Sequence, residues 1–272
     1  MALAQALMMG YRPLTTYDFD NKTLVQGGVG TSLTPISTSS PAAWSSDGLT
    51  LFAFKDGVLS QYSVSSAFDV TNIGSSTTAS VSFDHANLTA RRNRQVNISN
   101  DGYYAVGLRE SNSVEIAETD TSFDFTSNAT VTKSSLIALP ATPRNYSRSA
   151  GLSPDGTKYY VTDENENVYE YTIDLANKTV SSHDATVVGT LQTNLNSNIA
   201  VAPDHILVGT NAGYLKIPRV SGSISGQTMP SLITTDSHGT AYNDAIIYAN
   251  DGSTLWFYET SGDLWYEYDT SN

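Results

Sequence analysis

The sequence of 272 residues contains no cysteine. Disulfide bonds, thiolate zinc sites and cysteine nucleophiles are therefore excluded. Basic residues are also few, since 14 Lys and Arg stand against 27 Asp and Glu, for a formal net charge of −13. That charge repels phosphate backbones and anionic lipid surfaces, so nucleic acid is not expected as a partner. No run of apolar residues approaches the length of a transmembrane helix, so membrane insertion is not expected.

Motifs for metal, cofactor or nucleophilic chemistry are missing as well. The four histidines have no ligand-like spacing, and we interpret them as solvated or turn residues: His85, His183, His205 and His238. The acidic run at Asp163, Glu164 and Glu166 lacks the glycine and terminal Glu of a calcium loop, which favours a solvated corner. No nucleophile elbow, phosphate loop or dinucleotide fingerprint occurs. We therefore expect no cofactor, no metal and no enzymatic activity, although the sequence leaves a catalytic carboxylate pair open.

What the sequence does contain is a repeat. A short apolar run, a turn with a conspicuous aspartate and a second apolar run recur at intervals of about 50 residues. The five copies are "AAWSSDGLTLFAF", "QVNISNDGYYAVGL", "SAGLSPDGTKYYV", "NIAVAPDHILVG" and "IIYANDGSTLWFY". A further alternating strand follows each copy, and the connectors, such as "KTVSSHDATVVGT", favour a fourth. Four short antiparallel strands per repeat are typical of a β-propeller blade.

The two chain ends predict how the ring closes. The last copy stops at Asn272 before its outermost strand, whereas N-terminal "TYDFDNKTLVQGGVGT" resembles "TIDLANKTVSSHDATVVGT". The fold class predicted is all-β: a five-bladed β-propeller over residues 13–272, closed by an N-terminal strand that removes an exposed sheet edge. The alternative is a pair of β-sandwiches in which Asp-Gly turns recur by chance. Phe68 and Phe123 occupy matching corners and are expected to pack in the core, with ligand stacking as the alternative.

The composite repeat resembles propeller repeats of bacteriophage virion proteins, particularly tail-associated ones. "WSSDGLTLFAFKDGVLSQYSVSSAFDVTN" and "LSPDGTKYYVTDENENVYEYTIDLANKT" carry the resemblance, which extends from about Pro13 onward. It implies a multi-copy structural protein located in the virion, mounted on tail or capsid, that acts in assembly or host adsorption. The alternatives are a glycan-binding, lectin-like module, suggested by the Tyr and Trp content, and a propeller hydrolase or lyase.

Residues 1–12 are predicted to form an extension outside the ring, without the features of a secretory signal. Its residues favour a helix that Gly10 and Pro13 stop. We expect it to dock on other virion proteins through its large apolar side chains, which are Leu3, Leu7, Met8 and Met9. A frayed terminus is the alternative.

One mouth of the central channel is the predicted ligand site. Counting seven residues back from each turn aspartate gives the starts of the innermost strands, at Ser40, Arg94, Arg148, Ser197 and Asp244. Arg94 and Arg148 are expected to bind a carboxylate, such as that of an acidic sugar on the host surface, with Asp244 across the mouth and Asn93 and Tyr146 nearby. Alternatively, the arginines pair with neighbouring carboxylates and join the strands.

Overall fold

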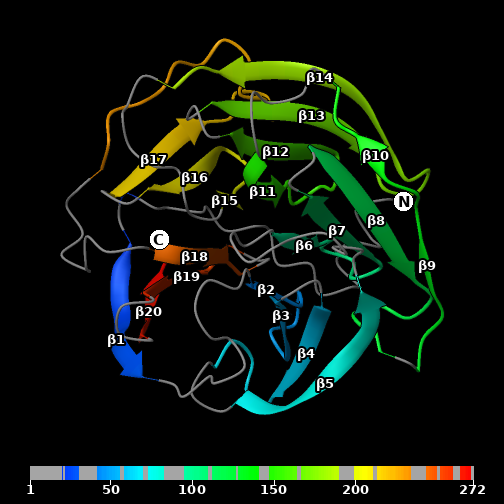
Figure 1. Ribbon diagram of the computed structural model, residues 1–272. Coiled ribbons are helices and arrows are strands. Elements are labelled where there is room, and N and C mark those ends of the chain that lie inside the picture. Colours follow the sequence, from blue (N-terminus) through cyan, green and yellow to red (C-terminus); the bar gives the residue numbers. More distant parts are fainter. Residues whose placement is uncertain are drawn as a thin grey trace, which may run out of the picture.

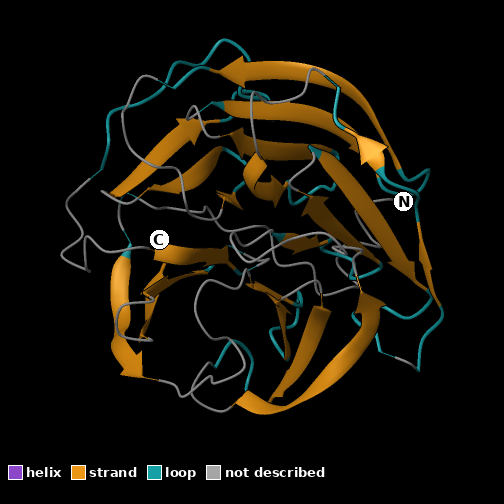
Figure 2. Cartoon of the chain, viewed as in Figure 1, coloured by secondary structure: helices purple, strands orange, loops and turns teal. Residues whose placement is uncertain are grey.

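The protein folds into five separate antiparallel sheets arranged around one axis (Figure 1). The structure is a computed structural model, and it describes residues 20, 22–30, 42–55, 58–69, 73–82, 95–109, 112–126, 128–140, 147–163, 167–189, 199–210, 213–233, 243–249, 252–259 and 264–270. These residues form strands and loops, and none of them lies in a helix (Figure 2). The predicted five-bladed β-propeller is confirmed, and a pair of two-sheet sandwiches is excluded.

Within each blade the strands follow one another outward from the axis in chain order, except that the outermost strand of blade 5 is the first strand of the chain. Blade 1 holds β2 (Ala42–Trp44), β3 (Thr50–Lys55), β4 (Val58–Val64) and β5 (Ile73–Ser82). Blade 2 holds β6 (Val96–Ile98), β7 (Tyr104–Arg109), β8 (Ser113–Thr119), β9 (Val131–Lys133) and β10 (Ile137–Ala138). Blade 3 holds β11 (Ser147–Leu152), β12 (Lys158–Asp163), β13 (Val168–Asp174) and β14 (Thr179–Val187). Blade 4 holds β15 (Ile199–Val201), β16 (His205–Thr210) and β17 (Gly213–Pro218). Blade 5 holds β18 (Asn243–Tyr248), β19 (Thr254–Glu259) and β20 (Leu264–Asp269), with β1 (Thr23–Gly30) outermost.

Blade 5 joins the two ends of the chain, as predicted. β1 pairs antiparallel with β20, from Thr23 opposite Asp269 to Gly30 opposite Leu264. Blade 4 is the irregular copy, because a single bridge between Tyr214 and Ile233 stands where the other blades have a fourth strand.

The hydrophobic core lies between blades rather than within one of them. Each of five clusters of buried side chains is shared by two neighbouring blades, and together they occupy all five seams of the ring. The innermost strands β2, β6, β11, β15 and β18 also approach one another in a closed circle. Between blades 3 and 4 the approach requires a glycine, since a Cβ at Gly151 would lie 2.5 Å from the Val201 side chain. A blade therefore buries its apolar faces only against its neighbours.

The repeated Ser-x-Asp-Gly sequence forms a self-contained turn between the first two strands of a blade. In blade 1, the Ser45 hydroxyl donates to the Asp47 carboxylate (2.6 Å) and accepts the backbone N–H of Thr50 (2.9 Å). The following glycine, Gly48, has φ +69°. The same bonds and a positive-φ glycine recur in blades 2 and 3. The sequence motif is thus explained by local hydrogen bonding.

Phe68 and Phe123 cover these turns. Their backbones have φ near +60°, and their N–H groups donate to the carbonyls of Gly48 and Gly102. Each ring rests directly on its glycine, because an added Cβ would lie 2.6 Å from ring carbon. Phe68 also stacks on Trp256 of blade 5, with ring centroids 5.6 Å apart. The expected core-packing role is confirmed.

One position on the third strand of each blade faces the outer corner of the next blade. The residues at this latch position are Gln61, Ile116, Glu170, Lys216 and Glu267, which lie opposite equivalent residues of the second strand. Gln61 binds both the Phe123 carbonyl (3.0 Å) and the Phe125 N–H (2.6 Å) of blade 2. The other four blades have different residue types at the latch position, and their contacts differ accordingly.

Three of these latches are charged. Glu170 accepts from the Ile224 N–H (2.7 Å) of blade 4, and Lys216 forms an ion pair with Asp20 beside blade 5. Glu267 of blade 5 instead faces blade 1, where burial, together with the Asp69 carboxylate, raises the pKa of Glu267. The seams are therefore alike in apolar packing but unequal in polar contacts.

The contact between ring and glycine can be separated from the cost of positive φ. We expect Gly102→Ala to destabilise the protein by about 3 kcal/mol, because the methyl group must displace the Phe123 ring as well as adopt φ +76°. Gly226 has φ +74° but no atom within 4 Å of an added Cβ, so Gly226→Ala is the matched control, with an expected loss of about 1 kcal/mol. Chemical denaturation of both variants measures these losses. Equal losses of stability would contradict a packing role of the Phe123 ring against Gly102.

Candidate functional site

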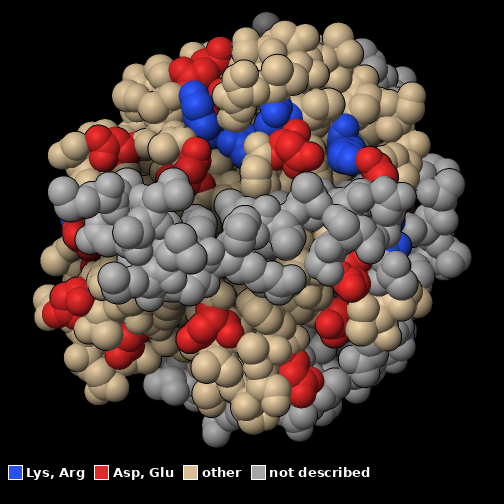
Figure 3. Space-filling model, turned by 180° about the vertical axis from the view of Figure 1, so that it is seen from behind, with Lys and Arg blue, Asp and Glu red and all other residues tan. Residues whose placement is uncertain are grey.

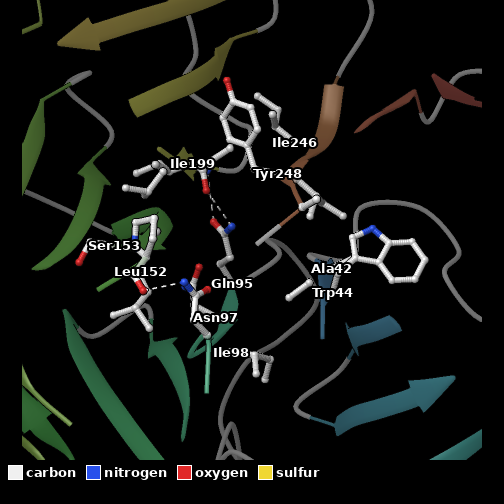
Figure 4. Close-up of a pocket in the computed structure, with 18 residues that line it drawn as sticks. Ala42, Trp44, Gln95, Asn97, Ile98, Leu152, Ser153, Ile199, Ile246 and Tyr248 are labelled. Carbon is white, nitrogen blue, oxygen red and sulfur yellow. Dashed lines mark hydrogen bonds between the residues drawn. The ribbon is translucent and has the colours of Figure 1, made fainter. Parts of the chain in front are cut away.

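A small cavity lies at the axis, where the innermost strands of all five blades meet (Figure 4). Its volume is about 80 Å³, enough for several water molecules. Most of the residues that line it have apolar side chains, and the polar side chains on its wall include Gln95, Asn97, Asn100 and Ser153. Among the described wall residues, the one titratable side chain belongs to Tyr248.

Gln95 is the side chain that ties three blades together at this cavity. It precedes β6 of blade 2 and is 4% exposed. Its Oε1 accepts the Ala150 N–H (3.0 Å) of blade 3, and its Nε2 donates to the Ile199 carbonyl (3.2 Å) of blade 4. Figure 4 shows the amide of Gln95 directed at Ile199. Because both ends of the amide are engaged by backbone groups, Gln95 joins strands rather than offering a free donor or acceptor to a ligand.

The other polar wall residues also bind protein groups. Asn100 donates to the Pro154 carbonyl (2.7 Å), which connects the turns of blades 2 and 3. Ser153 donates to Asp155 (2.5 Å) within its own turn. The described wall therefore has the hydrogen bonds of a structural axis, and it brings together no nucleophile with a base.

The seam between blades 3 and 4 holds a buried arginine. Arg219 is 6% exposed, and its guanidinium donates to the Tyr160 hydroxyl (2.7 Å) and to the carbonyls of Ala202 (2.5 Å) and Gly222 (2.9 Å). It also lies over the Tyr160 ring, 5.4 Å from the centroid. Burial raises the pKa of Tyr160, so this hydroxyl stays protonated as it accepts from Arg219.

A second cation, Lys158, lies beside the seam that contains Arg219. Its ammonium group is 2.8 Å from Asp184 and 3.4 Å from Glu170. Most Lys and Arg side chains visible in Figure 3 gather in the upper part of the face, the part formed by β12–β14, next to acidic side chains. The described cations of this region are engaged within the protein, because Lys158 and Lys178 bind carboxylates and Arg219 binds carbonyl and hydroxyl oxygens.

The predicted ligand residues are only partly placed. Arg148 lies in β11 and Asp244 in β18, which are the innermost strands of blades 3 and 5. Each falls at a register shift, between Ser147 and Ser149 and between Asn243 and Ala245. The side chains of both lie outside what the structure describes, as do the whole residues Asn93, Arg94 and Tyr146, and the extension residues Leu3, Leu7, Met8 and Met9. The carboxylate site therefore stays a prediction.

Two minor expectations were wrong. Asp163 is not solvated, because it is fully buried and accepts the Tyr169 hydroxyl (2.9 Å) and the Asn167 N–H (2.9 Å). His205 is not solvated either, since it is buried between blades 4 and 5. Asp163 finds its partners in its own hairpin, whereas Tyr248, which meets His205, lies in another blade.

Sequence reasoning missed Gln95, Arg219 and Glu170. Gln95 is adjacent to the predicted Arg94, yet only the ring geometry shows that its amide reaches across to blade 4. For Glu170, the signal was its alignment with Gln61 and Glu267 in the repeat. Arg219 lies in the irregular segment after β17, where the repeat offers no guide.

The described residues contain neither a metal-binding cluster nor a membrane-spanning helix. No group of three or more His, Asp or Glu among them is placed to hold a metal ion. Nor does the described part of the chain include a helix long and apolar enough to cross a membrane.

The bridging role of Gln95 has a direct test. We expect Gln95→Met to lower the free energy of unfolding by about 2 kcal/mol, because the Ala150 N–H and the Ile199 carbonyl lose a buried partner. Gln227→Met, at a half-buried position in the loop after β17, is the control and should change stability by less than about 0.5 kcal/mol. Denaturant titration compares the stabilities of the two variants. Equal losses would contradict the role of Gln95 in joining the blades.

Comparison with solved structures finds many chains that match this one. No family model and no curated protein sequence matches it. A solved structure of a functionally unknown protein from Desulfotomaculum acetoxidans is similar, with a TM-score of 0.49 and 14% sequence identity. The match covers 76% of this chain and 60% of that one, so this chain spans about 60% of the length of its neighbour.

Proposed function

We propose that the protein is a structural component of a bacteriophage virion, mounted on tail or capsid, that serves particle assembly or host adsorption. The resemblance of its repeats to virion propellers supports this role. The observation that carries the proposal is the position of the N-terminal segment. β1 is the outermost strand of blade 5, and Asp20 just before it pairs with Lys216 of blade 4 (Figure 1).

This position suits a docking segment. The chain enters the ring at its outer rim, so whatever precedes Asp20 starts from the periphery rather than from the axis. Buried clusters of described blade residues occupy all five seams, so the proposal assigns the apolar side chains of segment 1–12 to a neighbouring protein rather than to a seam. Burial in a neighbouring virion protein would remove their apolar surface from water.

The docking role predicts that folding and assembly separate. Removing residues 2–10 should leave the thermal unfolding midpoint unchanged, because the closing strand begins at Thr23, but it should abolish incorporation into particles. Replacing Leu3, Leu7, Met8 and Met9 together by Ser should have the same effect, whereas Gln5→Ser is the matched control that still assembles. Incorporation of the truncated protein at the normal level would refute the docking role.

Adsorption through a host glycan is the second candidate, and the register shifts favour it. An extra residue in a strand pair re-aims side chains, and such irregularities concentrate near binding sites. Arg148 and Asp244 are those extra residues in blades 3 and 5, at the start of the innermost strands. With Arg94, Asn93 and Tyr146 they would form a carboxylate-binding mouth for an acidic sugar.

The mouth is tested by removing its two arginines. The double variant Arg94→Ala, Arg148→Ala should melt near wild type but bind host cells or an acidic glycan array at least about tenfold more weakly, because two charge-assisted bonds are lost. The double variant Lys133→Ala, Lys178→Ala removes the same charge elsewhere and should retain binding. A large fall in melting temperature with binding kept by the folded fraction would instead assign the arginines a structural role.

A further inference from the structure

A buried histidine joins blade 4 to blade 5. His205, the first residue of β16, is 1% exposed. Its Nε2 lies 2.9 Å from the hydroxyl of Tyr248, at the end of the innermost strand β18, and its Nδ1 lies 2.8 Å from the Asp204 carboxylate. The imidazole and the Tyr248 ring also meet edge to face, with centroids 5.8 Å apart. One side chain thus forms both polar and aromatic contacts across this seam.

The shortened turn of blade 4 places the histidine there. In blade 1 the turn runs from Ser45 to Thr50, with the N–H of Ser45 donating to the carbonyl of Thr50. In blade 4 the corresponding bond runs from Ala202 to His205 (2.8 Å), so the turn is two residues shorter and lacks the glycine. His205 therefore stands at the first position of the second strand, beside β18.

Both ring nitrogens have partners that fit a neutral imidazole. With Nδ1–H donating to Asp204, Nε2 is free to accept the Tyr248 hydroxyl proton. An imidazolium carries a proton on both nitrogens, so Nε2 can no longer accept and the hydroxyl hydrogen must turn away. Protonation therefore reverses this bond, with Nε2–H donating to the hydroxyl oxygen, and it places a positive charge on a side chain that is 1% exposed.

The surrounding charges do not offset the burial of this positive charge. The nearest carboxylate, Asp204, is 71% exposed, so water screens its attraction for an imidazolium. Lys216 of β17 disfavours a positive charge on His205, whereas Asp20, the ion-pair partner of Lys216, favours one. The Arg219 guanidinium binds the Ala202 carbonyl of the same turn. Burial is the largest effect, and it lowers the pKa of His205 below its ordinary value.

We propose that His205 is an acid-sensitive lock between blades 4 and 5, closed when the imidazole is neutral and released when it is protonated. Tyr248 lines the axial cavity, and Lys216 holds Asp20 next to the closing strand, so the released seam borders the blade that closes the ring. The lock is independent of any virion role.

The sign of the pH dependence follows from the lowered pKa. The unfolded chain takes up this proton near pH 6.5, whereas the folded chain takes it up only at lower pH. Between these values the unfolded state binds more protons, so the free energy of unfolding falls as the pH drops below about 6.5. Above that range His205 is neutral in both states and the lock contributes fully.

Thermal unfolding at pH 7.5 and pH 5.0 tests the lock. Wild type should lose roughly 3 °C more on acidification than His205→Gln, which keeps hydrogen-bonding capacity but cannot be protonated. His183→Gln is the matched control, because His183 contacts Thr186, Tyr169 and Tyr171 within blade 3, and it should keep the wild-type loss. Equal acid losses in wild type and His205→Gln would overturn the proposal.

A second measurement on the wild type covers the case in which His205→Gln does not fold. In an NMR titration the His205 ring should take up its proton below pH 6.5, and amide exchange in β16 and β18, corrected for intrinsic rates, should rise over the same range. Protonation at or above the ordinary pKa, or exchange in these strands that ignores it, would overturn the lock.

Discussion

Apolar contact between neighbouring blades holds the ring together. A four-stranded sheet has two faces, and in this protein each buried cluster is completed by side chains from two blades. An open row of blades would leave two apolar faces in water, so the stack gains most when it closes into a ring. Pairing β1 with β20 achieves that closure and places the first and last described strands of the chain in blade 5.

The repeat is uniform in its apolar residues and variable in its polar ones. The latch position carries a glutamine, an isoleucine, a lysine and two glutamates. Gln61, Glu170 and Lys216 bind polar partners there. Glu267 instead meets the carboxylate of Asp69. We therefore expect the seams to respond differently to pH and salt, although their packing is similar. Blade 4 departs furthest, because Arg219 and His205 replace regular repeat features with buried polar contacts to the blades on either side.

The axis of the ring is tied together rather than left open. Gln95 links three blades, and Asn100 links two turns. The cavity between them has room for only a few water molecules. Such an axis supports a rigid platform, and the proposed binding activities then belong to the rim and the mouth. A particle-mounted adsorption protein needs this kind of stable scaffold under loops and extensions that vary.

The repeated sequence motifs were enough to predict the fold class, the number of blades and the segment that closes the ring, because turn signals and strand alternation are local and recur along the chain. It also placed Phe68 and Phe123 in the core, since matching apolar positions in a repeat pack alike. Only the tertiary structure decided the roles of Gln95, His205 and Arg219. Their partners lie in other blades, more than 40 residues away for Tyr248 from His205 and more than 100 for Ile199 from Gln95. No local pattern encodes which buried polar groups meet when separate sheets come together around an axis.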